Sequence, residues 1–258
     1  VWNQLEKNFK LNHISCQELA MVTWSFSQNF MPSKSTFDAL MSCYTEQLYH
    51  RMNPFENALF LSSLARISIR LNHKISRELM EKFQKEFGIQ MQEYSKRDLF
   101  LLLWSCVRIG FELDETVLQK WIECAFLNKS ECDDQWKPHE FAGSLMVVAK
   151  MQLFLDKTTL TRIFQWMNEN IEQFDAQSLA TLMWSFGRMN LHVPESVFTR
   201  WNTQFECRLE QFTAQHLSNI LSSAVKLRGI RVLEKDNDIG ECFLWHWISA
   251  FDEKMETF

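Results

Sequence analysis

Five basic residues recur at nearly equal intervals along this chain of 258 residues. Successive members are 42, 42, 38 and 38 residues apart, and each lies near the end of a short apolar segment. The five residues are Arg66, Arg108, Lys150, Arg188 and Lys226. A row of cations at regular spacing could bind successive phosphates of a nucleic-acid backbone. We therefore take them as candidate phosphate contacts.

The segments that carry these cations are copies of one motif. Four copies are clear: Leu19 to Asn29, Leu99 to Ile109, Leu179 to Met189 and Leu217 to Leu227. Two diverged copies, Asn57 to Ile67 and Phe141 to Met151, fit between them. Counting the first residue of each copy as position 0, the cations stand at position 9, where the first copy has Gln28. Repeat periods of 20–50 residues are typical of stacked supersecondary units.

Each copy is predicted to be a helix, here called helix A. Apolar residues recur at positions 0, 3, 4, 7 and 10, which is a helical period. Four residues before position 0, five of the six copies have a residue type that caps helix N-termini. The residues at this place are Ser15, Asn53, Ser95, Lys137, Asp175 and Thr213. Pro54 and Pro138 follow at a helical position that tolerates proline.

A second helix, helix B, is predicted between successive A helices. Its clearest copies start near Leu113, Leu155 and Val193, and two of them end in Glu-Gln-Phe just before the next cap. We expect an all-α fold, a right-handed α-solenoid of about six helix-turn-helix repeats of 38–42 residues. The repeats start near residues 15, 53, 95, 137, 175 and 213 and form one domain, 1–258. Each four-residue expansion suits one added helical turn or a longer loop.

The C-terminal part departs from this pattern. Arg228 to Gly240 is the best candidate for a loop, and an amphipathic helix is expected from Glu241 to Glu256. No polar capping repeat follows, although a solenoid usually has one. We expect the sequence to be a fragment of a longer repeat array.

Charge is distributed unevenly between the two helix types. From four residues before position 0 to position 10, the six A helices contain eight Lys or Arg and five Asp or Glu, whereas the whole chain has net charge −5. Helix A therefore leans positive, and helix B with the loops leans negative. The alternative explanation of the basic column is helix-end electrostatics, because a cation near a helix C-terminus gains about 0.3–1 kcal/mol.

Two further columns could contact base edges. Positions −2 and 2 vary in residue type, with polar or small residues in several copies, while the framework around them repeats, as in helical repeats that each recognise one base. The candidates are Gln17, Arg97, His139, Gln177, Thr181, Gln215 and Asn219. Unselected surface positions would also vary, so this alternative stays open.

Position 5 carries tryptophan in three copies, Trp24, Trp104 and Trp184. Indoles could stack on bases, but aromatic residues at regular helical spacing are usually core, and we expect these to pack between repeats. Position 6 is Ser in five copies, and position 8 is often small. Small residues there are expected where helices cross closely.

Enzyme motifs are lacking. The seven histidines form no HExxH or other close ligand pair, and Cys124 and Cys132 lack zinc-site spacing. The sequence has no glycine-rich phosphate loop and no GxSxG motif. We predict no catalytic residues, no metal site and no cofactor. The odd number of cysteines, seven, favours reduced thiols, and no apolar run is long enough to cross a membrane.

The repeated motif resembles the octotricopeptide repeat family, to which FAST-kinase-like and RAP-containing organelle proteins are similar. The resemblance rests on Gln177-Ser178-Leu179, Trp184-Ser185-Phe186 and Arg188, with their counterparts in the other copies. It implies a mitochondrial or, alternatively, plastid RNA-binding protein acting in RNA maturation, stability or translation, or as a ribosome component. Two features differ from the family: no RAP-like segment is present, and the net charge is acidic.

The expected partner is single-stranded RNA or ribosomal RNA, with ribosomal or other proteins meeting the acidic side of helix B. The alternative is a protein-interaction scaffold that binds no nucleic acid, such as a bacterial effector or assembly-factor solenoid. The negative net charge favours this alternative, because nucleic-acid-binding domains usually carry a basic surplus.

Overall fold

The computed structural model describes residues 14–29, 31–127, 136–226 and 247–248. Within these ranges the protein is all-α, with eleven α-helices and no strand. Helices that follow one another in the sequence pack together, which is consistent with a helical-repeat arrangement. None of the helices in these ranges is long and apolar enough to span a membrane. The chain divides into two compact units, Val1–Asp134 and Gln135–Phe258.

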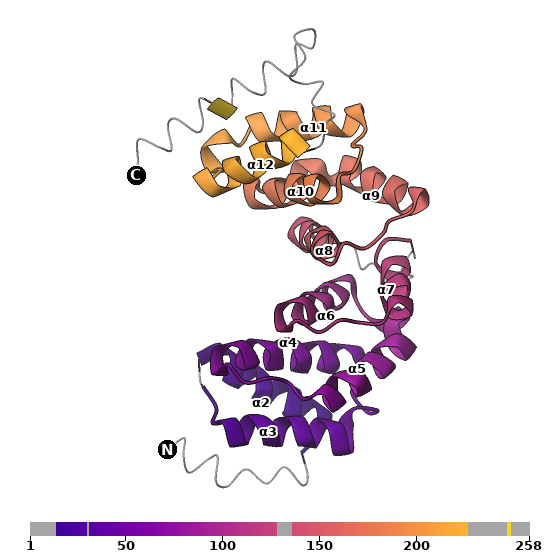
Figure 1. Ribbon diagram of the computed structural model, residues 1–258, viewed down its shortest axis with the longest axis vertical. Helices are drawn as coiled ribbons and strands as arrows, with labels where there is room; N and C mark the ends of the chain where they lie inside the picture. Colours follow the sequence, from indigo (N-terminus) through magenta and orange to yellow (C-terminus); the bar gives the residue numbers. More distant parts are fainter. Residues whose placement is uncertain (1–13, 30, 128–135, 227–246, 249–258) are drawn as a thin grey trace. The chain divides into compact units, whose positions relative to one another are not determined.

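The first unit contains the first three copies of the motif. Its A helices are α2 (Cys16–Asn29), α4 (Pro54–Leu71) and α6 (Lys96–Ile109). Its B helices are α3 (Lys34–Cys43), α5 (Arg77–Gln90) and α7 (Glu115–Ile122). Helix α4 packs against both α2 and α6, while α5 contacts α7, so the A helices form one layer and the B helices another (Figure 1).

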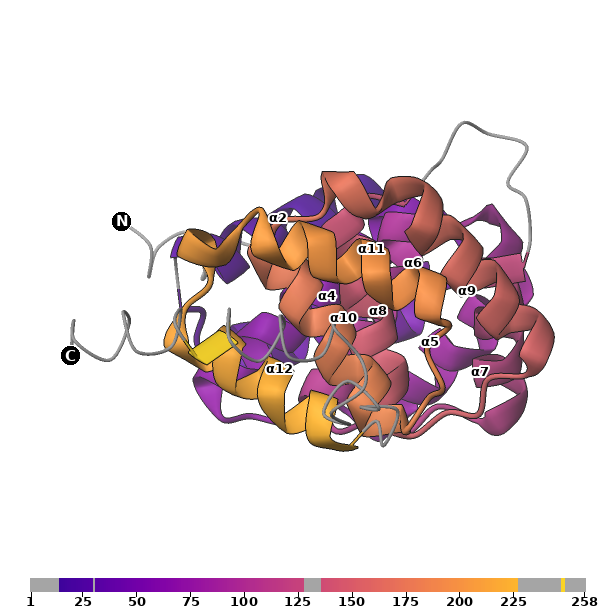
Figure 2. The ribbon, with the colours of Figure 1, turned by 90° about the horizontal axis from the view of Figure 1, so that it is seen from above.

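The second unit repeats this arrangement. Its A helices are α8 (Pro138–Met151), α10 (Ala176–Met189) and α12 (Ala214–Lys226), and its B helices are α9 (Lys157–Asn170) and α11 (Glu195–Glu206). Helix α10 packs against α8 and α12, and α9 packs against α11. Figure 2 shows α12 lying alongside α10.

A short segment of 3₁₀-helix or π-helix follows each of the five B helices. Three of these segments are 3₁₀-helices and two are π-helices: Met91–Glu93, Ile171–Gln173 and Leu209–Gln211, then Tyr44–Leu48 and Glu123–Leu127. In the second, fourth and fifth copies a buried aromatic, Tyr94, Phe174 or Phe212, follows the segment and precedes the next cap. Burial of this aromatic fixes where the chain enters the next A helix.

The predicted N-caps are confirmed where their side chains can accept a hydrogen bond. The Ser95 hydroxyl accepts from the Asp98 amide at 3.1 Å, and the Asp175 carboxylate accepts from the Ser178 amide at 2.7 Å. At Asn53 a full capping box forms with Glu56. Each of these bonds satisfies an amide that the helix itself cannot pair.

The A helices also share a way of ending. Four of them end at a residue in the left-handed region, with φ between 47° and 70°: Asn72, Gly110, Gln152 and Asn190. Helix α4 has 18 residues, whereas α6, α8 and α10 have 14. One extra turn of α4 therefore accounts for the longer spacing between the second and third copies.

The next spacing is longer for a different reason. Helices α7, α9 and α11 begin at Glu115, Lys157 and Glu195, the same distance after position 0 in their copies. The four added residues of the third repeat therefore lie between Glu115 and Lys137. This interval includes residues 128–135, which are outside the ranges that the structure describes.

The core contains a repeated tryptophan contact between helix B and helix A. The indole Nε1 of Trp121 donates to the Leu99 carbonyl at 3.0 Å, and that of Trp201 donates to the Leu179 carbonyl at 3.1 Å. Both carbonyls belong to position 0. In the sixth copy Trp247 donates to the Leu217 carbonyl at 2.7 Å. Trp247 lies within the predicted helix Glu241 to Glu256, of which only residues 247–248 are described, and Arg228 to Gly240 is outside the described ranges.

The predicted close helix crossing is confirmed between α10 and α12. A Cβ atom added to Gly187, at position 8, would lie 2.6 Å from Cβ of Ser223, at position 6 of the next copy. Atoms cannot approach that closely, so the backbones meet only because both residues are small. This contact explains why small residues recur at positions 6 and 8.

A polar network is buried where position 0 is not apolar. Asn57 is fully buried; its side chain accepts a hydrogen bond from the Tyr44 hydroxyl at 3.1 Å and donates to the Tyr94 hydroxyl at 3.0 Å. Burial raises the pKa of both tyrosines. The network satisfies an amide that would otherwise destabilise the core.

Candidate nucleic-acid interface

The candidate residues lie on the solvent side of the A helices. Positions −2, 2, 5 and 9 are four, three and four residues apart, so they form one stripe along a helix. Position 0 is buried in all six copies, and position −2 is exposed in all six. We call the surface formed by positions −2, 2, 5 and 9 the A face.

The basic residues at position 9 differ in exposure. Arg108, Lys150 and Arg188 are exposed, and Arg66 is half-buried. Lys226 is the last residue of α12, and its side chain lies outside what the structure describes. Within the first unit, Arg66 and Arg108 lie on the neighbouring helices α4 and α6, and within the second, Lys150 and Arg188 lie on the neighbouring helices α8 and α10.

The A-face arginines are not neutralised. Among the residues with described side chains, Arg66, Arg97, Arg108 and Arg188 have no carboxylate partner within 4.0 Å. Three cations of the B helices are paired, whereas Arg162 of α9, like the A-face arginines, has no described carboxylate partner. These pairs are Arg77–Glu81 at 2.7 Å, Lys82–Glu78 at 2.7 Å and Arg200–Glu172 at 3.3 Å. The uncompensated guanidinium groups keep their donors available for an anion.

Helix-end electrostatics does not explain Arg66. Because α4 is one turn longer, Arg66 lies five residues before its end, while Arg70 occupies the last turn. If the only role of this cation were a favourable interaction with the helix dipole, it would lie in the last turn of the longer helix. Arg66 instead keeps position 9, which places it beside the neighbouring helix α2. Arg108, Lys150 and Arg188 lie in the last turns of their helices, so there both causes apply.

The side chain of Gln28 connects two copies of the motif. With its amide oriented to satisfy both neighbouring donors, the Gln28 oxygen accepts from Arg66 Nη1 and from Trp24 Nε1, each at 3.2 Å. Gln28 and Arg66 both occupy position 9. Equivalent positions of the first and second copies therefore lie side by side.

The acidic residues of the A helices face other groups. Glu18 accepts hydrogen bonds from the Ser15 amide and hydroxyl, and these bonds lower its pKa. Asp98 and Glu140 are buried at their helix starts, where Asp98 accepts from the Ser95 hydroxyl. The carboxylates thus serve the caps at one end of each helix.

The candidate residues for base-edge contacts lie on the A face. Gln17, Arg97, His139, Gln177 and Gln215 are exposed at position −2, and Thr181 and Asn219 are half-buried at position 2. The Thr181 hydroxyl donates to the Gln177 carbonyl at 2.8 Å. This internal bond uses the Thr181 proton but leaves its oxygen able to accept. On α10, Gln177, Thr181 and Arg188 share one stripe.

The prediction that the position-5 indoles pack in the core is wrong for Trp24, which is 41% exposed. Trp104 and Trp184 are half-buried. Among the described residues, the fully buried tryptophans are Trp121 and Trp201 of the B helices, which the helix A pattern did not identify. Their 22-residue separation from position 0 is a sequence signal that could have found them.

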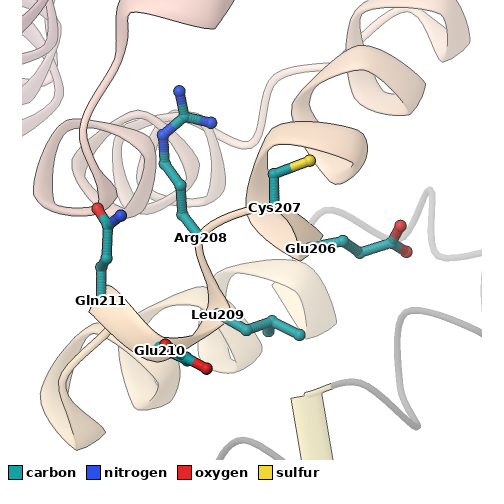
Figure 3. A pocket seen from close by; sticks show the side chains of 6 residues that line it. All are labelled: Glu206, Cys207, Arg208, Leu209, Glu210 and Gln211. Carbon is teal, nitrogen blue, oxygen red and sulfur yellow. The ribbon is translucent and has the colours of Figure 1, made fainter.

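The hollows and thiols of the described residues do not form an arrangement suited to catalysis. A hollow of about 470 Å³ is lined by the residues from Glu206 to Gln211. Figure 3 shows their side chains. Its arginine, Arg208, donates to the Glu172 carbonyl at 2.7 Å, and its thiol, Cys207, is exposed. Elsewhere burial raises the pKa of Cys106 to about 12, which suppresses the nucleophilic thiolate. No group of three potential metal ligands occurs in the described part of the chain.

Compared with known proteins, the chain matches no protein-family model and no curated protein. Fold and surface therefore define a class only: an all-α protein of sequentially packed helices, whose A-face arginines have no described carboxylate partner.

Proposed function

We propose that this chain is an RNA-binding protein of the octotricopeptide type, a right-handed α-solenoid of about six repeats. It binds single-stranded RNA or ribosomal RNA on the A face, in mitochondria or alternatively in plastids. Its role is in RNA maturation, stability or translation, or as a ribosome component. The observation that carries this proposal is the set of unpaired arginines on the A face.

The proposed contacts divide by position. The position-9 cations Arg66, Arg108, Lys150, Arg188 and Lys226 bind phosphates, and the polar residues at positions −2 and 2 contact base edges. Phosphate contacts supply affinity without sequence preference, whereas base-edge contacts supply specificity. The Arg97 guanidinium, exposed at position −2 of α6, could serve either purpose.

Salt dependence of binding tests the proposal. Replacing Arg108, Lys150 and Arg188 together with Gln should lower RNA affinity. It should also flatten the slope of log K against log salt by about 2–3, because RNA binding then releases fewer counterions from the phosphates. Fluorescence anisotropy with a labelled RNA pool measures both quantities.

A matched control carries the same charge change on the B helices. Arg77, Arg162 and Arg200 are exposed residues of α5, α9 and α11, and their joint replacement by Gln should leave the slope nearly unchanged. Absence of binding to any RNA pool at low salt would contradict the proposal for this chain. Equal losses in the two triple variants would indicate net charge rather than the A face.

The second candidate is a protein-interaction scaffold. It is favoured by the net charge of −5, which rests on the B helices and loops. An acidic surface repels RNA and attracts basic protein segments. Failure of RNA binding together with salt-sensitive binding of a basic peptide would favour this candidate.

A further inference from the structure

The A face of the first unit is more apolar than that of the second. Position 2 is Met21, Leu59 and Leu101 in the first unit, and Gly143, Thr181 and Asn219 in the second. Three large side chains of the first unit's A face are well exposed: Met21 at 48%, Trp24 at 41% and Phe55 at 59%. Met21 and Trp24 lie three residues apart on α2, and Phe55 lies on the neighbouring helix α4. Exposed apolar side chains on adjacent helices are typical of a binding surface.

Trp24 is held in place although its ring is exposed. Its Nε1 donates to the Gln28 oxygen, which also accepts from Arg66. The indole therefore needs no further partner at its edge, and its remaining exposed surface is aromatic. The same oxygen fixes the Arg66 guanidinium close to the indole. An aromatic surface and a cation are thus presented together by α2 and α4.

The charges around these side chains select an anionic partner. Arg66, Arg97 and Arg108 belong to the same unit, and none of them is paired with a described carboxylate. The neighbouring acids Glu18 and Glu56 accept hydrogen bonds from the backbone at helix caps. A partner that is both aromatic and anionic matches this surface, whereas an apolar protein surface would leave the arginines without counter-charges.

We propose that α2 and α4 form a stacking site for an unpaired RNA base, with Trp24 as the platform and Arg66 contacting the adjacent phosphate. The proposal rests on the RNA-binding function and specifies how the first unit contributes to it. Stacking tolerates all four bases because each has an aromatic face. Stacking in the first unit therefore adds affinity for single strands, while base discrimination belongs to the polar residues at positions −2 and 2.

The test compares two labelled 12-mers, an RNA and the corresponding abasic ribose-phosphate chain. Wild-type protein should bind the base-bearing strand about five- to a hundredfold more tightly, since stacking on one aromatic side chain contributes that much. Trp24→Ala should lower this ratio by at least about fivefold, without changing the salt slope. Trp24→Phe should keep much of it because a phenyl ring still stacks. Arg66→Gln should instead flatten the slope by about 0.7.

Ile89→Ala is the matched control, because Ile89 is 65% exposed on α5 of the same unit but lies outside the A face. It should leave the ratio unchanged. Unchanged thermal melting of Trp24→Ala shows that the fold is retained, as expected for a surface side chain.

The outcomes separate this proposal from the broader one. Salt-dependent RNA binding with equal affinity for both 12-mers overturns the stacking site and leaves the RNA-binding function standing. Lack of binding to either strand at low salt overturns both. If Trp24→Ala leaves the ratio intact but abolishes self-association in sedimentation, the surface contacts a second copy of the chain, and stacking is likewise overturned.

Discussion

The side-chain oxygen of Gln28 accepts a hydrogen bond from Nη1 of Arg66 at 3.2 Å, and the two residues occupy the same position in successive copies of the motif. Residues at position 9 of the first two copies therefore lie side by side on the surface of the first unit. The partner of Arg66 is a neutral amide, so the guanidinium is positioned without being neutralised. The geometry orients a cation while leaving its charge for a ligand.

Gln28→Glu should convert this contact into an ion pair. The new carboxylate would neutralise Arg66, so RNA affinity should fall and the salt slope should flatten by about 0.7. The free energy of unfolding should change by less than about 1 kcal/mol, as ion pairs that remain accessible to solvent contribute little. Gln92→Glu adds the same charge at an exposed site after α5 and should affect RNA binding much less. Equal effects of the two variants would argue against a positioned Arg66.

Much of the helix layout could be predicted because it depends on local signals. Caps such as Ser95 and Asp175, and the apolar period of each A helix, are contained within a few residues. The exposure of the tryptophan side chains does not follow from such local signals. Trp24 and Trp201 are equally apolar by type, yet one is 41% exposed and the other 1% exposed. Their difference depends on which helix face meets the other layer, and a single helix cannot specify this.

The candidate interface was predictable as a set of columns but not as a surface. Spacing alone placed Arg66, Arg108 and Arg188 in one column. Whether carboxylates neutralise them depends on packing between helices, and the described residues include no carboxylate partner for them. The bond from Arg66 to Gln28 likewise joins residues of different copies, so no local pattern predicts it.

Gly187→Ala should destabilise the protein although alanine favours helices. The added methyl group would meet Ser223 Cβ at 2.6 Å and its Cα at 2.7 Å, forcing α10 and α12 apart. We expect a loss of about 1–3 kcal/mol in the free energy of unfolding, the range for overpacked cores. Urea denaturation of the purified variant measures this loss.

Gly88→Ala is the control for the crossing. Gly88 lies in helix α5, and a Cβ added there would meet only Cγ2 of Val117, at 3.7 Å, an ordinary contact. Its substitution should be neutral or stabilising by up to about 1 kcal/mol, the helix propensity difference. A Gly187 variant as stable as the Gly88 variant would show that the helices do not cross this closely.

Alkaline pH should weaken the protein through Tyr44 and Tyr94. Burial raises the pKa of both hydroxyls above the ordinary value of about 10. Above that pH the unfolded chain loses protons that the folded chain retains, so the unfolded state is favoured. Stability should be full below about pH 10 and should fall as pH rises further. Melting temperatures measured between pH 7 and 11 should decline more steeply in the wild type than in Tyr94→Phe, and identical declines would contradict the assignment.

The hydrogen bond of Trp247 to α12 corresponds to the tryptophan contact between helix B and helix A in the third and fifth copies. The Trp247 indole donates to the Leu217 carbonyl across 30 residues, where Trp121 and Trp201 span 22. Trp247 is 8% exposed. Trp247→Ala should therefore cost about 3–5 kcal/mol, as for other buried tryptophans. Trp184→Ala, at a half-buried position, should cost less. Urea denaturation of both variants distinguishes the cases: a loss below about 0.5 kcal/mol for Trp247→Ala would mean that residue 247 does not dock on α12.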